Sequence, residues 1–168
     1  MIRRVAGIAL LVALAASCGG EAGGWTFPVS LNTTRDSAEQ VLGLPSTERV
    51  LDSFLRYTRA GVDVRYDTDE RVEAIRFFAL DMGGRFNRAT VPVAYGVTAA
   101  DSMPSFLEKL GPPTTVDTSN AVAREKATTW VKDGITITAY TILTPEEWVQ
   151  ASTASGALLW MVVARTTP

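Results

Sequence analysis

The sequence lacks histidine entirely and contains a single cysteine among its 168 residues. Without histidine, Ser–His and Cys–His catalysis are excluded. One cysteine cannot form an internal disulfide, a multi-cysteine zinc site or an iron–sulfur cluster. The chain also has no Gly-x-Ser-x-Gly motif, no P-loop and no Gly-x-Gly-x-x-Gly motif. We therefore expect no catalytic residues, no cofactor and no metal, and binding functions become the main candidates.

Long hydrophobic runs are also scarce. The longest, Val5–Ala16, has about 12 residues, whereas a transmembrane helix needs about 20. This run follows Arg3 and Arg4 and precedes small residues, which is the layout of an export signal. We therefore predict that residues 1–17 are a signal peptide that is removed, and not a permanent transmembrane helix.

The only cysteine lies directly after the apolar run. Leu14-Ala15-Ala16-Ser17-Cys18 resembles a bacterial lipobox, in which small residues precede a cysteine that becomes lipid-modified. Lipid on Cys18 would fasten the protein to a membrane, because two or more acyl chains hold a protein on a bilayer whereas one binds reversibly. The alternative is a conventional signal peptide followed by an incidental thiol. Residues 18–25 are rich in glycine and predict a flexible tether.

The charge balance is slightly acidic, with 16 basic and 18 acidic side chains. Loss of Arg3 and Arg4 with the signal peptide leaves 14 basic side chains, and hence a net charge near −4. Such a balance disfavours nucleic acid as a partner. We expect an exported protein that is lipid-anchored to a membrane. Because Gly19 follows the cysteine, the outer membrane facing the periplasm is expected if the cell is Gram-negative.

Two short patterns occur twice and in the same order. Leu42-Gly43-Leu44-Pro45 matches Leu110-Gly111-Pro112-Pro113, and residues 57–64 match residues 130–137 at their aromatic, basic, glycine and β-branched positions. Ordered repetition of this kind predicts an internal duplication. The expected organisation is repeat 1 at 26–80, a linker at 81–93 and repeat 2 at 94–166.

Each repeat is predicted to begin with a helix that ends at the glycine of its Leu-Gly-x-Pro pattern. Thr33 or Thr34 can cap a helix over 35–42, and Asp101 or Ser102 can cap a helix that contains Pro104. Short turns then predict antiparallel strands. Their expected ranges are 48–58, 61–67 and 71–79 in repeat 1, and 126–132, 134–142 and 157–165 in repeat 2.

Repeat 2 carries an addition between its last two strands. Thr144, Pro145 and Glu147 form a capping-box pattern, which predicts a short helix near 145–151. The predicted fold class is therefore α+β. It consists of a tandem duplication of a helix plus an antiparallel three-strand unit, with the helices packed on one face of the sheet.

The strand at 61–67 alternates between apolar and charged residues. Val62, Val64 and Tyr66 occupy one side, and Asp63 and Arg65 occupy the other. This period of two is typical of a half-buried strand, so we expect Asp63 and Arg65 on the polar face.

Together with the lipobox and the Leu-Gly-x-Pro helix ends, the segment 66–75 resembles the SmpA/OmlA lipoproteins and the wider group that shares the β-lactamase-inhibitor-protein fold. The likeness covers about 28–78 and, more loosely, 92–165. It implies short helices on one face of an antiparallel sheet whose other face can be concave and aromatic. The duplication resembles the tandem inhibitor arrangement more than the single-unit assembly lipoprotein.

Asp67 and Asp69 begin like a calcium-binding loop. Arg71 stands where a third oxygen ligand is needed, and Val72 stands where the loop requires glycine. We therefore expect a polar hairpin turn here and no metal site.

The remaining candidate site is a surface of aromatic residues. Residues 157–164 are apolar on both faces of the predicted last strand, so one face is either exposed or covered by another element. Large aromatic side chains often anchor protein interfaces. The candidate partner-binding residues are Trp130, Tyr140, Trp148 and Trp160. The alternative is that these rings fill the core.

The sequence thus predicts a membrane-anchored bacterial cell-envelope lipoprotein that acts as a non-catalytic protein-binding or scaffold module. The alternative is a periplasmic inhibitor or immunity-like protein that blocks an enzyme through its sheet face. An enzyme that uses carboxylates alone would need two buried acids converging in a cleft.

Overall fold

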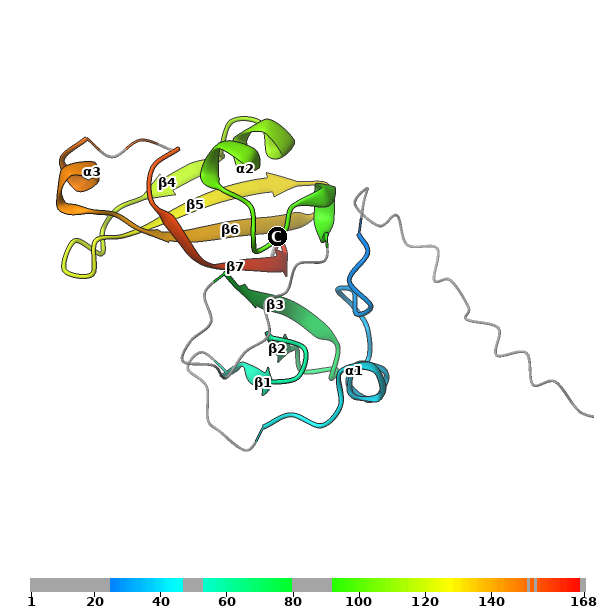
Figure 1. Ribbon diagram of the computed structural model, residues 1–168. Coiled ribbons are helices and arrows are strands. Elements are labelled where there is room, and N and C mark those ends of the chain that lie inside the picture. Colours follow the sequence, from blue (N-terminus) through cyan, green and yellow to red (C-terminus); the bar gives the residue numbers. More distant parts are fainter. Residues whose placement is uncertain (1–24, 47–52, 80–91, 151, 153, 167–168) are drawn as a thin grey trace, which may run out of the picture.

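The computed structural model describes residues 25–46, 53–79, 92–150, 152 and 154–166. The predicted signal peptide, Cys18, nearly all of the tether and most of the predicted linker lie outside these residues. The described residues form an α+β fold with one seven-stranded antiparallel sheet and a few short helices (Figure 1).

The first half of the molecule, residues 25–79, contributes one helix and three strands. Thr34 caps the helix, because its side chain accepts a hydrogen bond from Ser37 N. Gly43 ends the helix, and its N–H bonds to Glu39 O. The elements are α1 (Arg35–Leu42), β1 (Leu55–Tyr57), β2 (Val62–Tyr66) and β3 (Val72–Phe78).

The second half, residues 92–166, contributes the rest. Ser102 caps its longest helix through Ser105 N, and Thr144 and Glu147 form the predicted capping box at the start of the last helix. The elements are η2 (Ala94–Gly96), α2 (Met103–Leu110), β4 (Thr115–Asp117), β5 (Glu125–Lys132), β6 (Ile135–Ile142), α3 (Pro145–Val149) and β7 (Ala157–Arg165).

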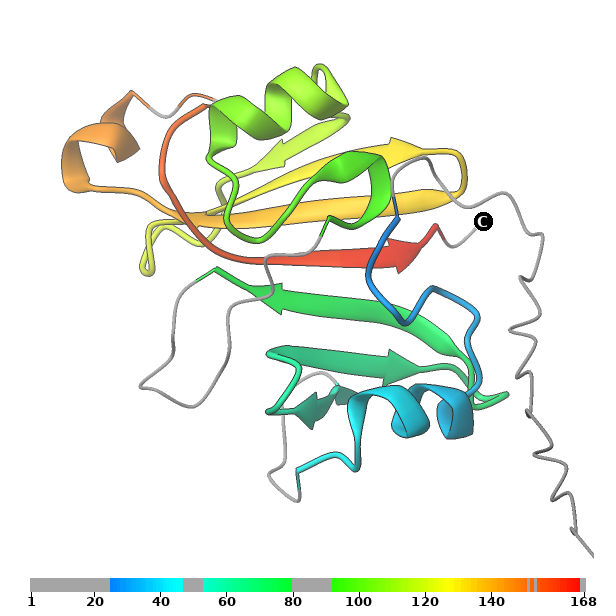
Figure 2. The same cartoon turned by 45° about the vertical axis from the view of Figure 1, so that its right-hand side comes forward.

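The strand order is β1-β2-β3-β7-β6-β5-β4, so the two halves meet through β3 and β7 (Figure 2). Ile75 lies opposite Val163, and Phe77 lies opposite Met161. All strand pairs are antiparallel. The last strands of the two halves therefore form the centre of a continuous sheet.

One hydrophobic core runs across both halves. It combines buried helix residues, such as Leu42 of α1 and Phe106 of α2, with alternate strand residues such as Phe77 and Met161. We call the side of the sheet that carries these strand residues the core face, and the opposite side the outer face. Because side chains alternate along a strand, Phe78 and Trp160 belong to the outer face.

The predicted helices and hairpin turns are confirmed, but some strand predictions are wrong. The first strand was expected over 48–58, yet β1 begins at Leu55, and residues 47–52 lie outside the described residues. The edge strand β4 was not predicted, because its three residues are too few for an alternating pattern to indicate a strand. No helix within the described ranges has the length and apolar character needed to cross a membrane.

Candidate functional site

Trp130 lies in the core and not on a surface. Its side chain is only 2% exposed. The indole ring stacks on Phe106 of α2 at a centroid distance of 5.7 Å, and Nε1 donates a 2.9 Å hydrogen bond to the backbone oxygen of Gly111. A buried indole whose N–H is satisfied is a packing residue. Trp130 is therefore not part of the candidate partner-binding surface.

Tyr140 and Trp160 lie together on the outer face. They are opposite each other on β6 and β7, and their half-buried rings stack with a centroid distance of 5.5 Å and an interplanar angle of 29°. On the other side of Trp160, Phe78 of β3 occupies the opposite position and is 4% exposed. Three neighbouring strands thus place an aromatic row of Phe78, Trp160 and Tyr140 across the middle of the outer face, and in this row Trp160 and Tyr140 are partly exposed whereas Phe78 is buried.

Trp148 occupies a different part of the molecule. It lies on α3, which follows the end of β6 and is seen at one end of the sheet in both ribbon views (Figures 1 and 2). Its side chain is half-buried. The structure therefore brings together two of the four predicted aromatic residues, Tyr140 and Trp160, and adds Phe78, which the sequence reasoning missed.

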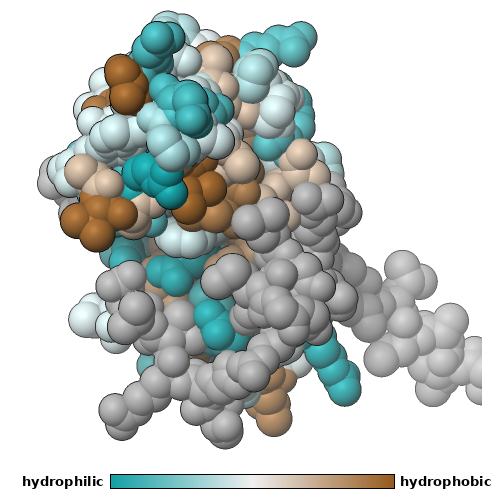
Figure 3. Space-filling model, turned by 60° about the vertical axis from the view of Figure 1, so that its left-hand side comes forward, coloured by the Kyte–Doolittle hydropathy of each residue, from teal (hydrophilic) through white to brown (hydrophobic). Residues whose placement is uncertain are grey.

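The end of the sheet that carries α3 also exposes several aliphatic side chains. Val122 in the β4–β5 loop is fully exposed, Val149 of α3 is 82% exposed and Ile142 of β6 is 40% exposed. Seen from this side, the brown hydrophobic areas are separated by hydrophilic side chains (Figure 3). They do not form one continuous apolar surface in the view shown.

The outer face of the first half is dominated by an ion-pair cluster. Asp63 lies on the face that the alternating pattern predicts, but it is fully buried there. Its carboxylate accepts hydrogen bonds from Arg56 at 3.1 and 3.4 Å and pairs with Arg76 Nη1 at 3.6 Å. The ring of Phe54 lies within 4.2 Å of the Arg76 guanidinium carbon. The alternating pattern identified the face of Asp63 but could not reveal that this part of the face is covered.

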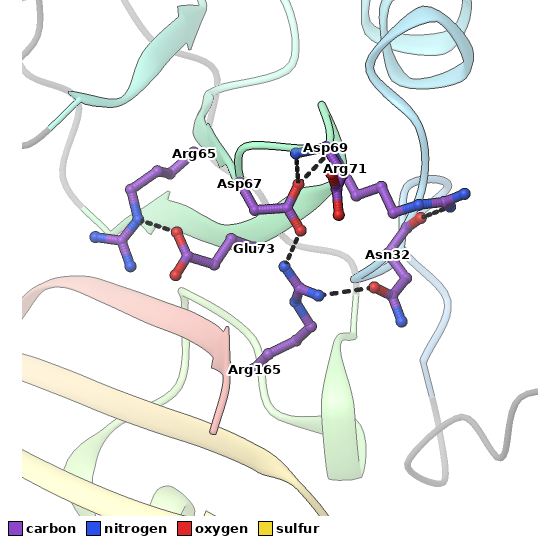
Figure 4. Close-up of polar contacts among 7 residues, drawn as sticks. All are labelled: Asn32, Arg65, Asp67, Asp69, Arg71, Glu73 and Arg165. Atoms are coloured by element: carbon purple, nitrogen blue, oxygen red, sulfur yellow. Dashed lines mark hydrogen bonds and ion pairs between the residues drawn. The ribbon is translucent and has the colours of Figure 1, made fainter. Parts of the chain in front are cut away.

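Asp67 forms a second polar cluster where the two halves meet (Figure 4). One carboxylate oxygen accepts hydrogen bonds from the backbone N–H groups of Asp69 and Arg71, both at 2.9 Å. The other oxygen pairs with Arg165 at the end of β7, which also donates to the Asn32 side chain. The backbone N–H of Arg71 and the Arg165 guanidinium lower the pKa of Asp67.

The carboxylate that the sequence placed in a calcium-like turn is therefore used to join the hairpin to the last strand. Within the described part of the chain, no group of three or more His, Cys, Asp or Glu side chains is arranged to hold a metal ion.

Lys126 of β5 is a buried charge that the sequence reasoning did not single out. It is 0% exposed and lies on the core face, where its Nζ donates to Ser152 O at 2.5 Å, to Ser155 O at 2.6 Å and to Ser155 Oγ at 3.1 Å. Burial lowers the pKa of Lys126, and the charge of Glu147 partly opposes this shift. The three acceptors come from one turn between α3 and β7.

A Ser–Lys pair can act as nucleophile and base, but the geometry here disfavours that chemistry. The Lys126 ammonium directs hydrogen bonds to three acceptors, and Ser155 Oγ itself donates to Ser152 O at 2.8 Å. The pair is therefore arranged to hold the turn. The polar clusters join segments within the molecule, whereas the rings of Tyr140 and Trp160 are partly exposed on the outer face.

Comparisons with known proteins add no relative: no family model matches the chain, and no curated protein or solved structure shows a significant match.

Proposed function

We propose that this chain is a non-catalytic protein-binding or scaffold module of the bacterial cell envelope, anchored to a membrane through lipid on Cys18. The observation that carries the binding role is the aromatic row on the outer face, in which Trp160 stacks on Tyr140 and lies opposite Phe78. Aromatic side chains provide large contact areas with few rotatable bonds, so they anchor many protein interfaces. The anchoring role rests on the lipobox-like segment 14–18.

The proposed architecture is a tandem duplication whose helices cover the core face, in the manner of the SmpA/OmlA and β-lactamase-inhibitor-protein group. Matched local geometry supports it. Thr34 and Ser102 cap their helices through the N–H three residues later, at 3.4 Å in each case. Gly43 and Gly111 end the helices with φ of 84° and 80°. At the matched positions 57 and 130 both aromatic side chains are buried.

A lipid-anchored module with these features would present its outer face to a protein in the envelope. The uncharged centre of that face in the second half, with Thr129, Thr138 and Val162 around the aromatic pair, suits contact with a folded protein surface. A net charge near −4 after removal of the signal peptide gives no reason to expect nucleic acid.

The test compares tryptophan variants of the full chain in the native envelope. Trp160→Ala is expected to lower partner affinity by about 30-fold, the loss that corresponds to one aromatic anchor of about 2 kcal/mol. Trp148→Ala is the matched control, because it removes the same side chain from α3, and we expect it to leave partner affinity within about threefold of the unmodified chain. Equal affinity of the Trp160→Ala variant and the unmodified chain would reject the outer face as the binding surface.

A second test addresses the anchor. Cys18→Ala should abolish acyl labelling and release the protein from the membrane, as measured by metabolic labelling and fractionation. Acyl labelling that persists in the Cys18→Ala variant would show that lipid is attached elsewhere.

A further inference from the structure

The connection between β6 and β7 begins next to the aromatic pair. Tyr140 lies opposite Trp160, but the next pair is Thr141 with Leu158, so β7 contains one extra residue, Leu159. Such a β-bulge bends its strand and changes the direction of the neighbouring side chains. The backbone oxygen of Leu159 accepts a 2.9 Å hydrogen bond from Ala79 N. The bulge is thus a fixed feature directly beside Trp160.

Lys126 lies on β5, two strands away from the bulged strand β7, and its side chain is on the core face. Its register partner on β6 is Thr141, the residue that follows Tyr140. From there its ammonium binds two backbone oxygens and one hydroxyl of the turn formed by residues 152 and 155. A buried ammonium is costly without acceptors, so the turn cannot move away without a large penalty.

Two further contacts tie the same connection to the sheet. The Glu147 carboxylate accepts hydrogen bonds from Thr144 N at 2.8 Å and from Gly156 N at 3.3 Å, which links the start of α3 to the start of β7. Gly156 also approaches β6 closely, since a Cβ at this position would lie 2.9 Å from Thr141 Cβ. The turn therefore determines where β7 begins.

We propose that Lys126 is a positioning residue for the aromatic row: it holds Ser152 and Ser155 just before the start of β7, which fixes the bulge at Leu159 and thereby the stacking of Trp160 on Tyr140. This inference rests on the proposed function, because it assigns the core-face lysine a role in shaping the binding surface on the outer face. Lys126 itself does not touch the partner.

The experiment uses the full chain labelled with 5-fluorotryptophan and observed by ¹⁹F NMR. The chain contains four tryptophans, Trp25, Trp130, Trp148 and Trp160, and each resonance is assigned with the corresponding Trp→Phe variant. Tyr140→Leu gives the reference shift for a Trp160 ring that has lost its stacking partner. Lys126→Met, which keeps the length of the side chain without its donors, is expected to move the Trp160 resonance in the same direction and to leave the Trp130 resonance in place.

Lys132→Met is the matched control, since Lys132 lies on the same strand and is exposed. It should leave the Trp160 resonance unchanged. A Lys126→Met variant that melts earlier but keeps the Trp160 resonance at its original position would overturn the proposal, because the lysine would then serve stability alone. If Lys126→Met does not fold, Ser155→Ala removes one of the three acceptors and should produce a smaller Trp160 shift. No shift in that variant would also overturn the proposal.

Measuring partner affinity distinguishes a failure of the positioning role of Lys126 from a failure of the proposed function. Lys126→Met is expected to weaken binding about tenfold, less than the loss of Trp160 itself. A shifted Trp160 resonance with unchanged affinity in Lys126→Met, while Trp160→Ala still weakens binding about 30-fold, would overturn only the positioning role. Unchanged affinity in Trp160→Ala would reject the proposed function, whatever the resonance does.

Discussion

The outer faces of the two halves differ in chemistry although their strands join in one sheet. In the first half, Asp63 is fully buried between Arg56 and Arg76, and Phe54 lies against the Arg76 guanidinium. In the second half, the half-buried pair of Tyr140 and Trp160 occupies the face. The same side of one sheet thus holds a buried ion-pair cluster in one half and a partly exposed aromatic pair in the other.

This difference follows from what each group requires. A buried carboxylate needs cations around it, so the Asp63 carboxylate is paired with the guanidinium groups of Arg56 and Arg76 within the first half. The stacked aromatic pair has no such requirement, and part of its surface remains accessible to another protein.

The largest effect is expected for Trp130→Ala. This side chain fills the core between β5 and α2, so its loss should lower the free energy of unfolding by about 3–5 kcal/mol in urea denaturation. Trp160→Ala should cost about 1 kcal/mol, because its ring is only half-buried. Equal losses for the two variants would show that Trp160 also belongs to the core.

The next effect is expected at the ion-pair cluster. Asp63→Ala leaves two guanidinium groups without their shared carboxylate and should lower the free energy of unfolding by about 3 kcal/mol. Glu73→Ala is the control, since it breaks the half-exposed pair with Arg65 and should cost at most about 1 kcal/mol. A loss for Asp63→Ala as small as the control's would contradict the structural role of the cluster.

A smaller effect is expected at Gly156. Its φ of 94° is unfavourable for other residues, and a Cβ would meet Leu143 Cδ2 at 2.8 Å, so Gly156→Ala should cost about 2 kcal/mol. Gly134 has a φ of 77° but open space around it, so Gly134→Ala should cost about 1 kcal/mol. Thermal unfolding measures the stability of both variants. A Gly134→Ala variant less stable than Gly156→Ala would argue against the close approach of Gly156 to Leu143.

The smallest effect concerns pH. The pKa of Asp67 is lowered by the Arg71 N–H and by Arg165, so its ionised form favours the folded state. That contribution is present above about pH 4 and is lost as the pH falls through the lowered folded-state pKa. Stability should therefore fall more steeply below pH 4 in the unmodified chain than in Asp67→Asn. If the free energy of unfolding falls equally with pH in the two proteins, Asp67 does not join the halves as an ionised group.

Local signals in the sequence predicted local structure well. Gly43 and Gly111 as helix ends, and the Thr144 capping box, depend on residues only a few positions apart, so their chemistry can be read directly. The pairing of β3 with β7 could not be read in this way, because no local pattern specifies which strands meet across a long connection.

The candidate site was predicted only in part, for a similar reason. Trp130 and Trp160 look alike in the sequence, yet one packs on Phe106 and the other stacks on Tyr140. Alternation predicts which residues share a face but not what covers that face. The same limit explains why the sequence does not reveal the burial of Asp63 or of Lys126, since both depend on contacts with other segments.

Site-specific photocrosslinking in the native envelope tests whether the outer face of the sheet binds a protein partner. A photoreactive phenylalanine replaces Tyr140 on the outer face or, as the matched control, Tyr95, which packs against the core. We expect position 140 to crosslink to one discrete protein partner and position 95 to give no such crosslink. Crosslinks to the same partner from position 95 alone would place the binding surface on the other side of the sheet and contradict the account.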